Sequence, residues 1–335
     1  MEAPRSLAGR ARWRLRLESS ALRARLGAAD LALFHDFADG PAGGANQSLW
    51  ALLRECTARG VVVQRNVLSP GTDACLFNSF NFDGDRLRLL ARRVGEVRMV
   101  HRVGAVTSLY RGYDDGTDAW VATLNRDLAH ATIAISQATI DMYRQVGIEL
   151  VEPRVIYNPC DPQIFNTEGR IPFSRHRRIR VVAVSWSPNP KKGGPVYRWL
   201  EDRLDSNRFE FTFVGNSSIR FERLRHVPPL PPRELATLLR QQDIFLTATE
   251  NDAYSNALVE ALSCGLPAVY LESGGSGEAV KEGGFGFLDR EEIPMLIDRL
   301  VDEYEERQAQ IALPKLAEIV DSYLDVLGLA RFVSG

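Results

Sequence analysis

Residues 249–269 read TENDAYSNALVEALSCGLPAV, and this stretch decides the fold. Ser255 or Asn256 is suited to cap a helix, because a side-chain oxygen there accepts a hydrogen bond from an N–H of the first turn. Gly265 ends that helix, and Pro267 prevents its continuation. The stretch and its apolar flanks therefore predict three elements in order: strand Ile244–Thr247, helix Asn256–Cys264 and strand Ala268–Leu271.

The start of this helix is a predicted anion site. The first amide groups of a helix have no partner within it and carry the positive end of the helix dipole, which favours phosphate. Asp252 lies in the loop just before this start, and Glu260 lies one turn inside the helix. A carboxylate offers two acceptor oxygens, so Glu260 is suited to bind the hydroxyl pair of a ribose.

Strands alternate with helices along the rest of the chain, which predicts two successive doubly wound α/β units with parallel sheets. In the first unit the expected strands are Leu31–Phe34, Val61–Gln64, Ala74–Phe77, Arg98–Val103, Thr132–Ser136 and Arg154–Tyr157. In the second they are Ile179–Val184, Phe209–Val214, Ile244–Thr247 and Ala268–Leu271. Ligands bind beyond the carboxyl ends of such strands, so both units should present loops to a shared cleft.

A break in the pattern divides the two units. Gly169, Pro172 and the run Arg175-His176-Arg177-Arg178 interrupt it with few apolar residues, as a linker would. The expected parts are an Arg-rich N-terminal extension (1–28), a Rossmann-like domain (29–165), a linker (166–178), a second Rossmann-like domain (179–310) and a C-terminal helical segment (311–335).

Composition excludes several other classes of protein. The 335 residues are 45% hydrophobic and 25% charged, with a formal net charge of −2. A near-neutral chain is a poor partner for nucleic acid, whose binding needs a basic excess. The four dispersed cysteines predict buried free thiols, and no apolar run approaches the ~20 residues of a membrane-spanning helix.

The N-terminal 28 residues are rich in arginine and lack the apolar core of a signal peptide. Two interpretations stay open. The segment is either an arm that contacts a membrane surface or a partner, or a solvated extension with one helix packed on the first domain. We expect a cytoplasmic protein, with peripheral contact at the inner membrane face under the first interpretation.

The segment 249–269 resembles the donor-binding motif of retaining family 4 glycosyltransferases (glycosyl transferase group 1) of the GT-B fold. In that motif two glutamates separated by seven residues precede Ala-x-x-x-Gly-x-Pro-Val. Asp252 takes the first acidic position and Glu260 the second. The resemblance implies that Asp252 binds hydroxyls of the donor sugar, Glu260 binds the ribose, and the backbone of Ser255, Asn256 and Ala257 meets the sugar and phosphates.

Further positions extend the resemblance into the first domain. The stretch 41–46, PAGGAN, resembles the family's glycine loop after the first strand, so Gly43, Gly44 and Asn46 are expected to approach the diphosphate. His101 matches a histidine that the family places against the donor sugar, although a structural histidine at a strand end is the alternative. Asn158 either lines the cleft or forms a turn.

Lys192, followed by Gly193, resembles the lysine that neutralises the leaving diphosphate. The family usually adds an arginine five residues earlier, where this chain has Ser187. We expect the neighbouring Lys191 to compensate as a point charge, although an ammonium does not reproduce the arginine fork.

The resemblance implies a hexosyl transferase that uses a nucleoside-diphosphate sugar as co-substrate and needs no cofactor or metal. Domain 29–165 would bind the acceptor, through Tyr110, Arg111 and Tyr113, and domain 179–310 the donor. The acceptor would be a glycan, a lipid-linked glycan or a small molecule. Asp114, Asp115 and Asp118 are expected to cap a helix and not to bind a metal.

Two other functions fit the same scaffold. A nucleotide-sugar 2-epimerase would share the nucleotide site but needs acid and base carboxylates from the N-terminal half. A degenerate, non-catalytic nucleotide-sugar-binding subunit would explain the missing arginine at Ser187.

Overall fold

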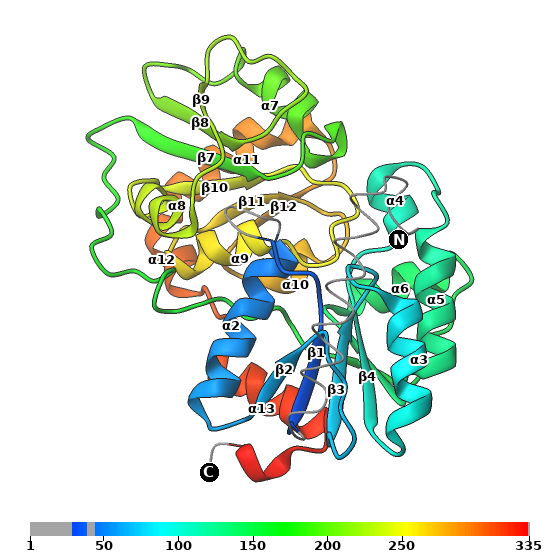
Figure 1. Ribbon diagram of the computed structural model, residues 1–335. Helices are drawn as coiled ribbons and strands as arrows, with labels where there is room; N and C mark the ends of the chain where they lie inside the picture. Colours follow the sequence, from blue (N-terminus) through cyan, green and yellow to red (C-terminus); the bar gives the residue numbers. More distant parts are fainter. Residues whose placement is uncertain (1–28, 39–43, 334–335) are drawn as a thin grey trace.

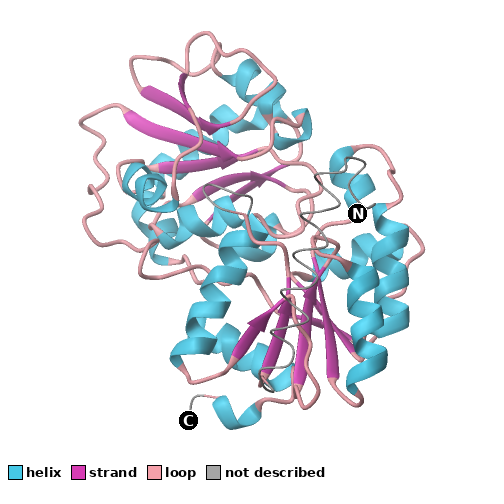
Figure 2. Ribbon diagram, viewed as in Figure 1, coloured by secondary structure: helices cyan, strands magenta, loops and turns pink. Residues whose placement is uncertain are grey.

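A computed structural model describes residues 29–38 and 44–333, which form two six-stranded sheets (Figures 1 and 2). Every strand pair in both sheets is parallel. Helices cover both faces of each sheet (Figure 2), as the right-handed crossovers of parallel sheets require. The predicted N-terminal extension 1–28 and Gly43 of the glycine loop lie outside the described residues.

The N-terminal sheet has the order β2-β1-β3-β4-β5-β6. Its strands are β1 Leu31–Phe34, β2 Val63–Arg65, β3 Ala74–Asn78, β4 Arg98–Val103, β5 Ala131–Ala134 and β6 Pro153–Val155. Its helices are α2 Gly44–Ala58, α3 Gly84–Val94, α4 Thr107–Arg111, α5 Thr117–Leu128 and α6 Gln137–Gln145. The strand order reverses between β1 and β3, which places a ligand crevice at the carboxyl ends of these strands.

The C-terminal sheet has the order β12-β11-β10-β7-β8-β9. Its strands are β7 Ile179–Ser185, β8 Phe209–Gly215, β9 Arg225–Val227, β10 Ile244–Thr247, β11 Ala268–Leu271 and β12 Gly284–Phe287. Its helices are η1 Pro190–Lys192, α7 Gly194–Leu200, α8 Pro232–Leu239, α9 Asn256–Ser263, α10 Ser276–Val280, η2 Arg290–Glu292, α11 Ile293–Asp302 and α12 Tyr304–Ala309. The order reverses between β7 and β10, directly beside α9.

The strands expected from the sequence are all present, with ends shifted by up to two residues. Two strands were not expected. β12 has the sequence GFGF, and its two glycines are weak strand formers. β9 is only three residues long and begins with the polar pair Arg225-His226. Both are edge strands of the C-terminal sheet, where pairing with a neighbour outweighs local preference.

The C-terminal segment returns to the N-terminal domain. Helix α13, Leu316–Val326, packs beside α2 under the β1–β2 side of that sheet (Figure 1), and η3, Ala330–Phe332, follows it. Ile319, Val320 and Leu324 of α13 are buried against Leu33 of β1 and Leu52 of α2. The chain therefore crosses between the two domains twice, once in each direction.

One arginine of the linker and one of β7 bind the same buried aspartate. Arg177 and Arg180 both donate to the carboxylate of Asp243, whose side chain is completely buried, with nitrogen–oxygen distances of 2.6 and 3.2 Å. Burial by itself would raise the pKa of Asp243, but the hydrogen bonds from Arg177 and Arg180 outweigh it and hold the pKa below its usual value. This cluster ties the linker to the start of β10.

Asp243→Ala is expected to lower the free energy of unfolding by about 3 kcal/mol, because it leaves two guanidinium groups beside a buried site without a carboxylate. Asp298→Ala, which breaks the exposed pair with Arg208, is the matched control and should cost no more than about 1 kcal/mol. Urea denaturation measures both, and equal losses in the two variants would contradict the assignment.

Candidate active site

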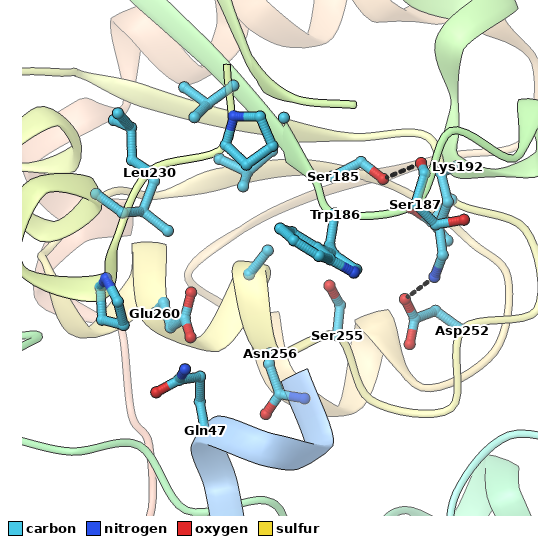
Figure 3. A pocket seen from close by; sticks show the side chains of 18 of the residues that line it. Gln47, Ser185, Trp186, Ser187, Lys192, Leu230, Asp252, Ser255, Asn256 and Glu260 are labelled. Atoms are coloured by element: carbon cyan, nitrogen blue, oxygen red, sulfur yellow. Dashed lines mark hydrogen bonds and ion pairs between the residues drawn. The ribbon is translucent and has the colours of Figure 1, made fainter. Parts of the chain in front are cut away.

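A cavity of about 360 Å³ lies between the two domains, at the carboxyl ends of β7 and β10. That volume is within the range of sites for small molecules. Gln47 of α2 (Figure 3), Tyr110 of α4 and Phe165 line it from the N-terminal side, and residues from Val184 onward supply the rest of its wall. The polar side chains from the C-terminal domain include Lys192, Asp252, Ser255, Asn256 and Glu260.

Helix α9 begins at this cavity. Its N-cap is Ser255, whose hydroxyl accepts from the N–H of Leu258 at 3.4 Å. Within the described residues, the amide N–H groups of Asn256 and Ala257 have no hydrogen-bond partner. Ser255, Asn256 and Ala257 all line the cavity, so the unpaired start of the helix faces it as predicted. Ser48 of α2 holds the Asn256 side chain by donating to its Oδ1 at 2.5 Å.

Lys192 and Asp252 form an ion pair inside the cavity. The Lys192 Nζ lies 2.9 Å from Asp252 Oδ2, and both side chains are mostly covered, with 23% and 17% exposure. The N–H of Gly275 donates to the backbone carbonyl of Asp252. The neighbouring Gly274 (φ +67°) packs so closely against this carbonyl that a Cβ at position 274 would lie 2.0 Å from its oxygen. Glycine is therefore required at 274, which the sequence analysis did not single out.

Glu260 lines the same cavity, and its carboxyl group has no hydrogen-bond partner among the described residues. The side chain is partly buried, and this burial raises its pKa to about 8. A carboxyl group that lines a cavity without a protein partner can accept hydrogen bonds from a ligand in the cavity. A pair of hydroxyl donors would supply them.

His101 does not reach the cavity, which corrects its expected role at the donor sugar. The ring is completely buried within the N-terminal domain and stacks on Phe77, with 4.3 Å between centroids. Its nitrogens are paired with Ser79 O at 3.1 Å and Asn125 Nδ2 at 3.2 Å, and burial lowers its pKa to about 3. The position is two residues before the end of β4, so the side chain packs within the domain and not beyond the edge of the sheet.

Near the predicted glycine loop, the residue that lines the cavity is not the expected one. Asn46 does not line the cavity: its amide pairs with both the N–H and the carbonyl of Ala38, at 3.1 and 3.2 Å. Gly44 is the first residue of α2, and Gln47, one residue after Asn46, lines the cavity instead. On a helix, adjacent residues point about 100° apart, and only the tertiary structure shows which of them faces the cleft.

Lys191 also points elsewhere, so it does not compensate for the missing arginine at Ser187. Its Nζ donates to the carbonyl of Leu109 at 3.0 Å and lies 3.7 Å from Glu250. Asn189 donates to the carbonyl of Tyr110 at 3.1 Å, and Asn251 is 3.4 Å from Leu109 O. Three side chains of the C-terminal domain thus bind the last carbonyl groups of α4 and hold this helix at the rim of the cavity.

Of the three expected acceptor residues, only Tyr110 lines the cavity. Its ring centroid lies 5.9 Å from the Lys192 ammonium, within the range of a cation–π contact. Arg111 instead bonds Asp115 at 2.6 Å and the Tyr110 hydroxyl at 3.2 Å, and the Tyr113 side chain is exposed outside the cavity.

The three aspartates after α4 bind backbone amides. Asp118 accepts from the N–H groups of Thr107 and Ser108, at 2.6 and 2.8 Å, and so caps α4 and not the helix on which it lies. Asp114 and Asp115 accept from Gly116 and Thr117, the latter being the first residue of α5. Among the described residues no cluster of three or more metal-binding side chains occurs.

A buried arginine that the sequence did not reveal ties the N-terminal sheet to α13, which packs against it. Arg102 is 2% exposed and donates to Asn78, Asn158 and the hydroxyl of Tyr323 in α13. Asn158, one of the expected cleft residues, lies outside the cavity and reaches the carbonyl of Tyr254 at 3.5 Å. All four cysteines are free thiols, and only Cys160 is not fully buried.

Comparison with known proteins identifies this architecture. Sucrose-phosphate synthase (tll1590) from Thermosynechococcus elongatus superposes with a TM-score of 0.70 at 13% identity, covering 91% of this chain and 99% of that one. Anabaena Alr3699/HepE in complex with UDP-glucose gives a TM-score of 0.61 at 16% identity, covering 90% and 98%. Two facing doubly wound domains with a cavity between them define the GT-B class, and the chain has this fold.

The family follows from the sequence matches. Residues 222–315 match the family model described as Glycosyl transferases group 1. D-inositol 3-phosphate glycosyltransferases are 26% identical over 275 residues in Corynebacterium efficiens and 25% identical over 275 in Corynebacterium glutamicum. Each alignment covers 77% of this chain, which spans about 60% of the length of these relatives. These matches agree with the predicted resemblance, and the matched region lies mainly in the C-terminal domain and includes the segment 249–269.

Glu260→Gln is expected to stabilise the protein at alkaline pH. The folded pKa of about 8 lies above the ordinary 4.5, so between these values the folded state binds an extra proton, and stability falls as pH rises from about 4.5 to about 8. Glutamine removes this dependence, and we expect a gain on the order of 2 kcal/mol at pH 8.5 and none near pH 4.5. Thermal melts across this range test it. Glu305→Gln, at an exposed position, is the control, and parallel melting curves for wild type and Glu260→Gln would contradict the assignment.

Proposed function

We propose that this protein transfers a sugar from a nucleoside-diphosphate sugar to a hydroxyl group of an acceptor, with retention of anomeric configuration and without a metal. The observation that carries the proposal is the start of α9. Unpaired amide groups, the Lys192–Asp252 pair and the unpartnered Glu260 all face one cavity between the two domains.

The donor would extend along α9. Glu260 would accept from the two ribose hydroxyls, and the amides of Asn256 and Ala257 would bind the diphosphate. Asp252, on the other side of the helix start, would accept from hydroxyls of the sugar. Beyond Glu260, apolar side chains such as Leu230 and Leu235 line the cavity and would cover the base.

The chemistry places its main demand on the leaving group. As the bond from the anomeric carbon to the phosphate oxygen breaks, the bonding electrons move onto the diphosphate, and Lys192 would stabilise that charge. The acceptor hydroxyl would attack from the same face, forming the new carbon–oxygen bond, and its proton would pass to the departing phosphate oxygen. In this scheme the protein positions the two substrates and stabilises the charge on the leaving diphosphate, and no side chain acts as nucleophile.

The acceptor would approach past Tyr110, the residue of α4 that lines the cavity. A glycan, a lipid-linked glycan or a small molecule would present the hydroxyl, and the relatives named for D-inositol 3-phosphate favour a small polar acceptor. None of the helices that the structure describes has the length and hydropathy to span a bilayer. We propose that the reaction takes place in the cytoplasm, and contact of residues 1–28 with the inner membrane face stays a prediction.

An epimerase fits the cavity less well. Such an enzyme needs acid and base carboxylates from the N-terminal half, whereas the lining residues that the described N-terminal domain contributes are Gln47, Tyr110 and Phe165, none of which carries a carboxylate. The ion pair at the sugar end of the cavity also favours catalysis over mere binding.

The first test is ligand binding and turnover. UDP, GDP, ADP and dTDP are added separately, and at 100 times its Kd the cognate nucleotide should stabilise the fold by about 2.7 kcal/mol. The corresponding UDP-, GDP-, ADP- and dTDP-glucose should then release nucleoside diphosphate slowly in EDTA. No stabilisation by any of the four would contradict the proposal. Stabilisation without turnover would favour the binding subunit, isomerisation of donor alone the epimerase, and loss of turnover in EDTA a metal-dependent reaction.

Lys192→Ala is expected to lower kcat by about 10²- to 10³-fold, because removing one preorganised group that stabilises transition-state charge typically costs this much. Lys281→Ala removes the same charge from an exposed position outside the cavity and serves as control. Release of nucleoside diphosphate measures both, and an unchanged kcat in Lys192→Ala would refute its role at the leaving group.

A further inference from the structure

Trp186 follows β7 directly and is a large apolar side chain that the fold leaves uncovered. Its exposure is 48%, and of the exposed large hydrophobic residues in the described part of the chain it alone lines the cavity. A tryptophan buries much apolar area when it packs in a core, so an open position inside a cleft indicates contact with something the cleft binds.

The backbone beneath this side chain is rigidly held. Asn216 donates to the carbonyl of Trp186 at 2.8 Å, and the Ser185 hydroxyl donates to the carbonyl of Ser187 at 2.9 Å. Gly215 of β8 approaches so closely, at φ +129°, that a Cβ there would lie 1.8 Å from the Ser185 carbonyl oxygen. The indole is therefore presented from a fixed support at the carboxyl edge of the sheet.

The direction of the ring relates it to the proposed donor site. Figure 3 shows the indole projecting over the start of α9, between Glu260 on one side and the Lys192–Asp252 pair on the other. Its nitrogen edge faces Ser255 and the ion pair (Figure 3). Within the described residues no hydrogen bond to the indole nitrogen occurs, although this N–H can only donate.

The cavity offers few positive charges to a diphosphate, so the indole N–H of Trp186 is a needed hydrogen-bond donor. Lys192 is the only cationic side chain among the described lining residues, and Ser187 stands where the resemblance has an arginine. A diphosphate that meets one ammonium and the helix start still has oxygen atoms to satisfy. Hydrogen bonds to charged acceptors are stronger than those between neutral groups.

We propose that Trp186 is a donor-binding residue whose indole N–H donates to an oxygen of the β-phosphate, the phosphate nearer the sugar, while its ring covers the link between phosphate and sugar. This inference rests on the proposed function and adds to it a source of selectivity. A site built in this way prefers nucleoside diphosphates to monophosphates through a neutral donor in place of an arginine.

Isothermal titration of UDP and UMP, ADP and AMP, and GDP and GMP tests the role in the full chain at pH 8. Trp186→Phe keeps an aromatic ring but removes the N–H. It should raise the Kd of the cognate diphosphate about tenfold, as expected for loss of a hydrogen bond to a charged group, and change the Kd of the monophosphate by no more than about twofold. Trp186→His restores a ring N–H and should recover most of the diphosphate preference. Trp199→Phe alters a tryptophan outside the cavity and should bind as wild type.

Thermal melts without ligand show whether the variants fold, and a half-exposed side chain predicts melting temperatures close to that of wild type. An unchanged ratio of diphosphate to monophosphate affinity in Trp186→Phe overturns the inference, while nucleotide binding by wild type leaves the proposed function standing. Equal losses in Trp186→Phe and Trp186→His also overturn it. If wild type binds none of these nucleotides, the proposed function fails and the inference with it.

Discussion

Helix α9 begins where its first amide groups have no partner within the described protein, and this unpaired start governs the arrangement around it. An open helix end in a cleft is stable only if water or a ligand satisfies it. The chain surrounds it with fixed groups: Ser48 from the other domain holds Asn256, and glycine at 274 fixes the backbone of Asp252. These contacts hold the helix start in place, as the proposed anion site requires.

Contacts between the domains keep the N-terminal wall in place. Lys191 binds the end of α4, and Glu278 accepts from the first two amides of α6, at 2.9 and 2.8 Å. Arg102 joins the N-terminal sheet to α13, the helix that returns from the C-terminal domain. Lys191 and Glu278 thus satisfy helix ends of the N-terminal domain with side chains from the C-terminal domain, and the first of these contacts holds α4, which carries Tyr110, at the rim of the cavity.

Groups that the fold leaves unsatisfied mark the proposed reaction site. Burial raises the pKa of Glu260, whose carboxyl group has no hydrogen-bond partner in the described protein, and the Trp186 indole stays open over the same helix. Both side chains stabilise the fold less than well-packed apolar residues at the same two positions would. The fold concentrates such losses at the cleft, where the proposed charged and hydroxylated donor would compensate them.

The amino-acid sequence by itself determined the two doubly wound units, all but two edge strands, and the start of α9, because caps, glycine stops and apolar periodicity act locally. It also located Asp252 and Glu260, since fixed spacing within and just before α9 carries them to the cleft, and Lys192, which lies in η1 beyond the carboxyl end of β7. Only the tertiary structure decided that His101 is buried, that Lys191 binds α4 and that Gln47 replaces Asn46 at the cavity. Their directions depend on packing between segments distant in sequence, about which neighbouring residues carry no information.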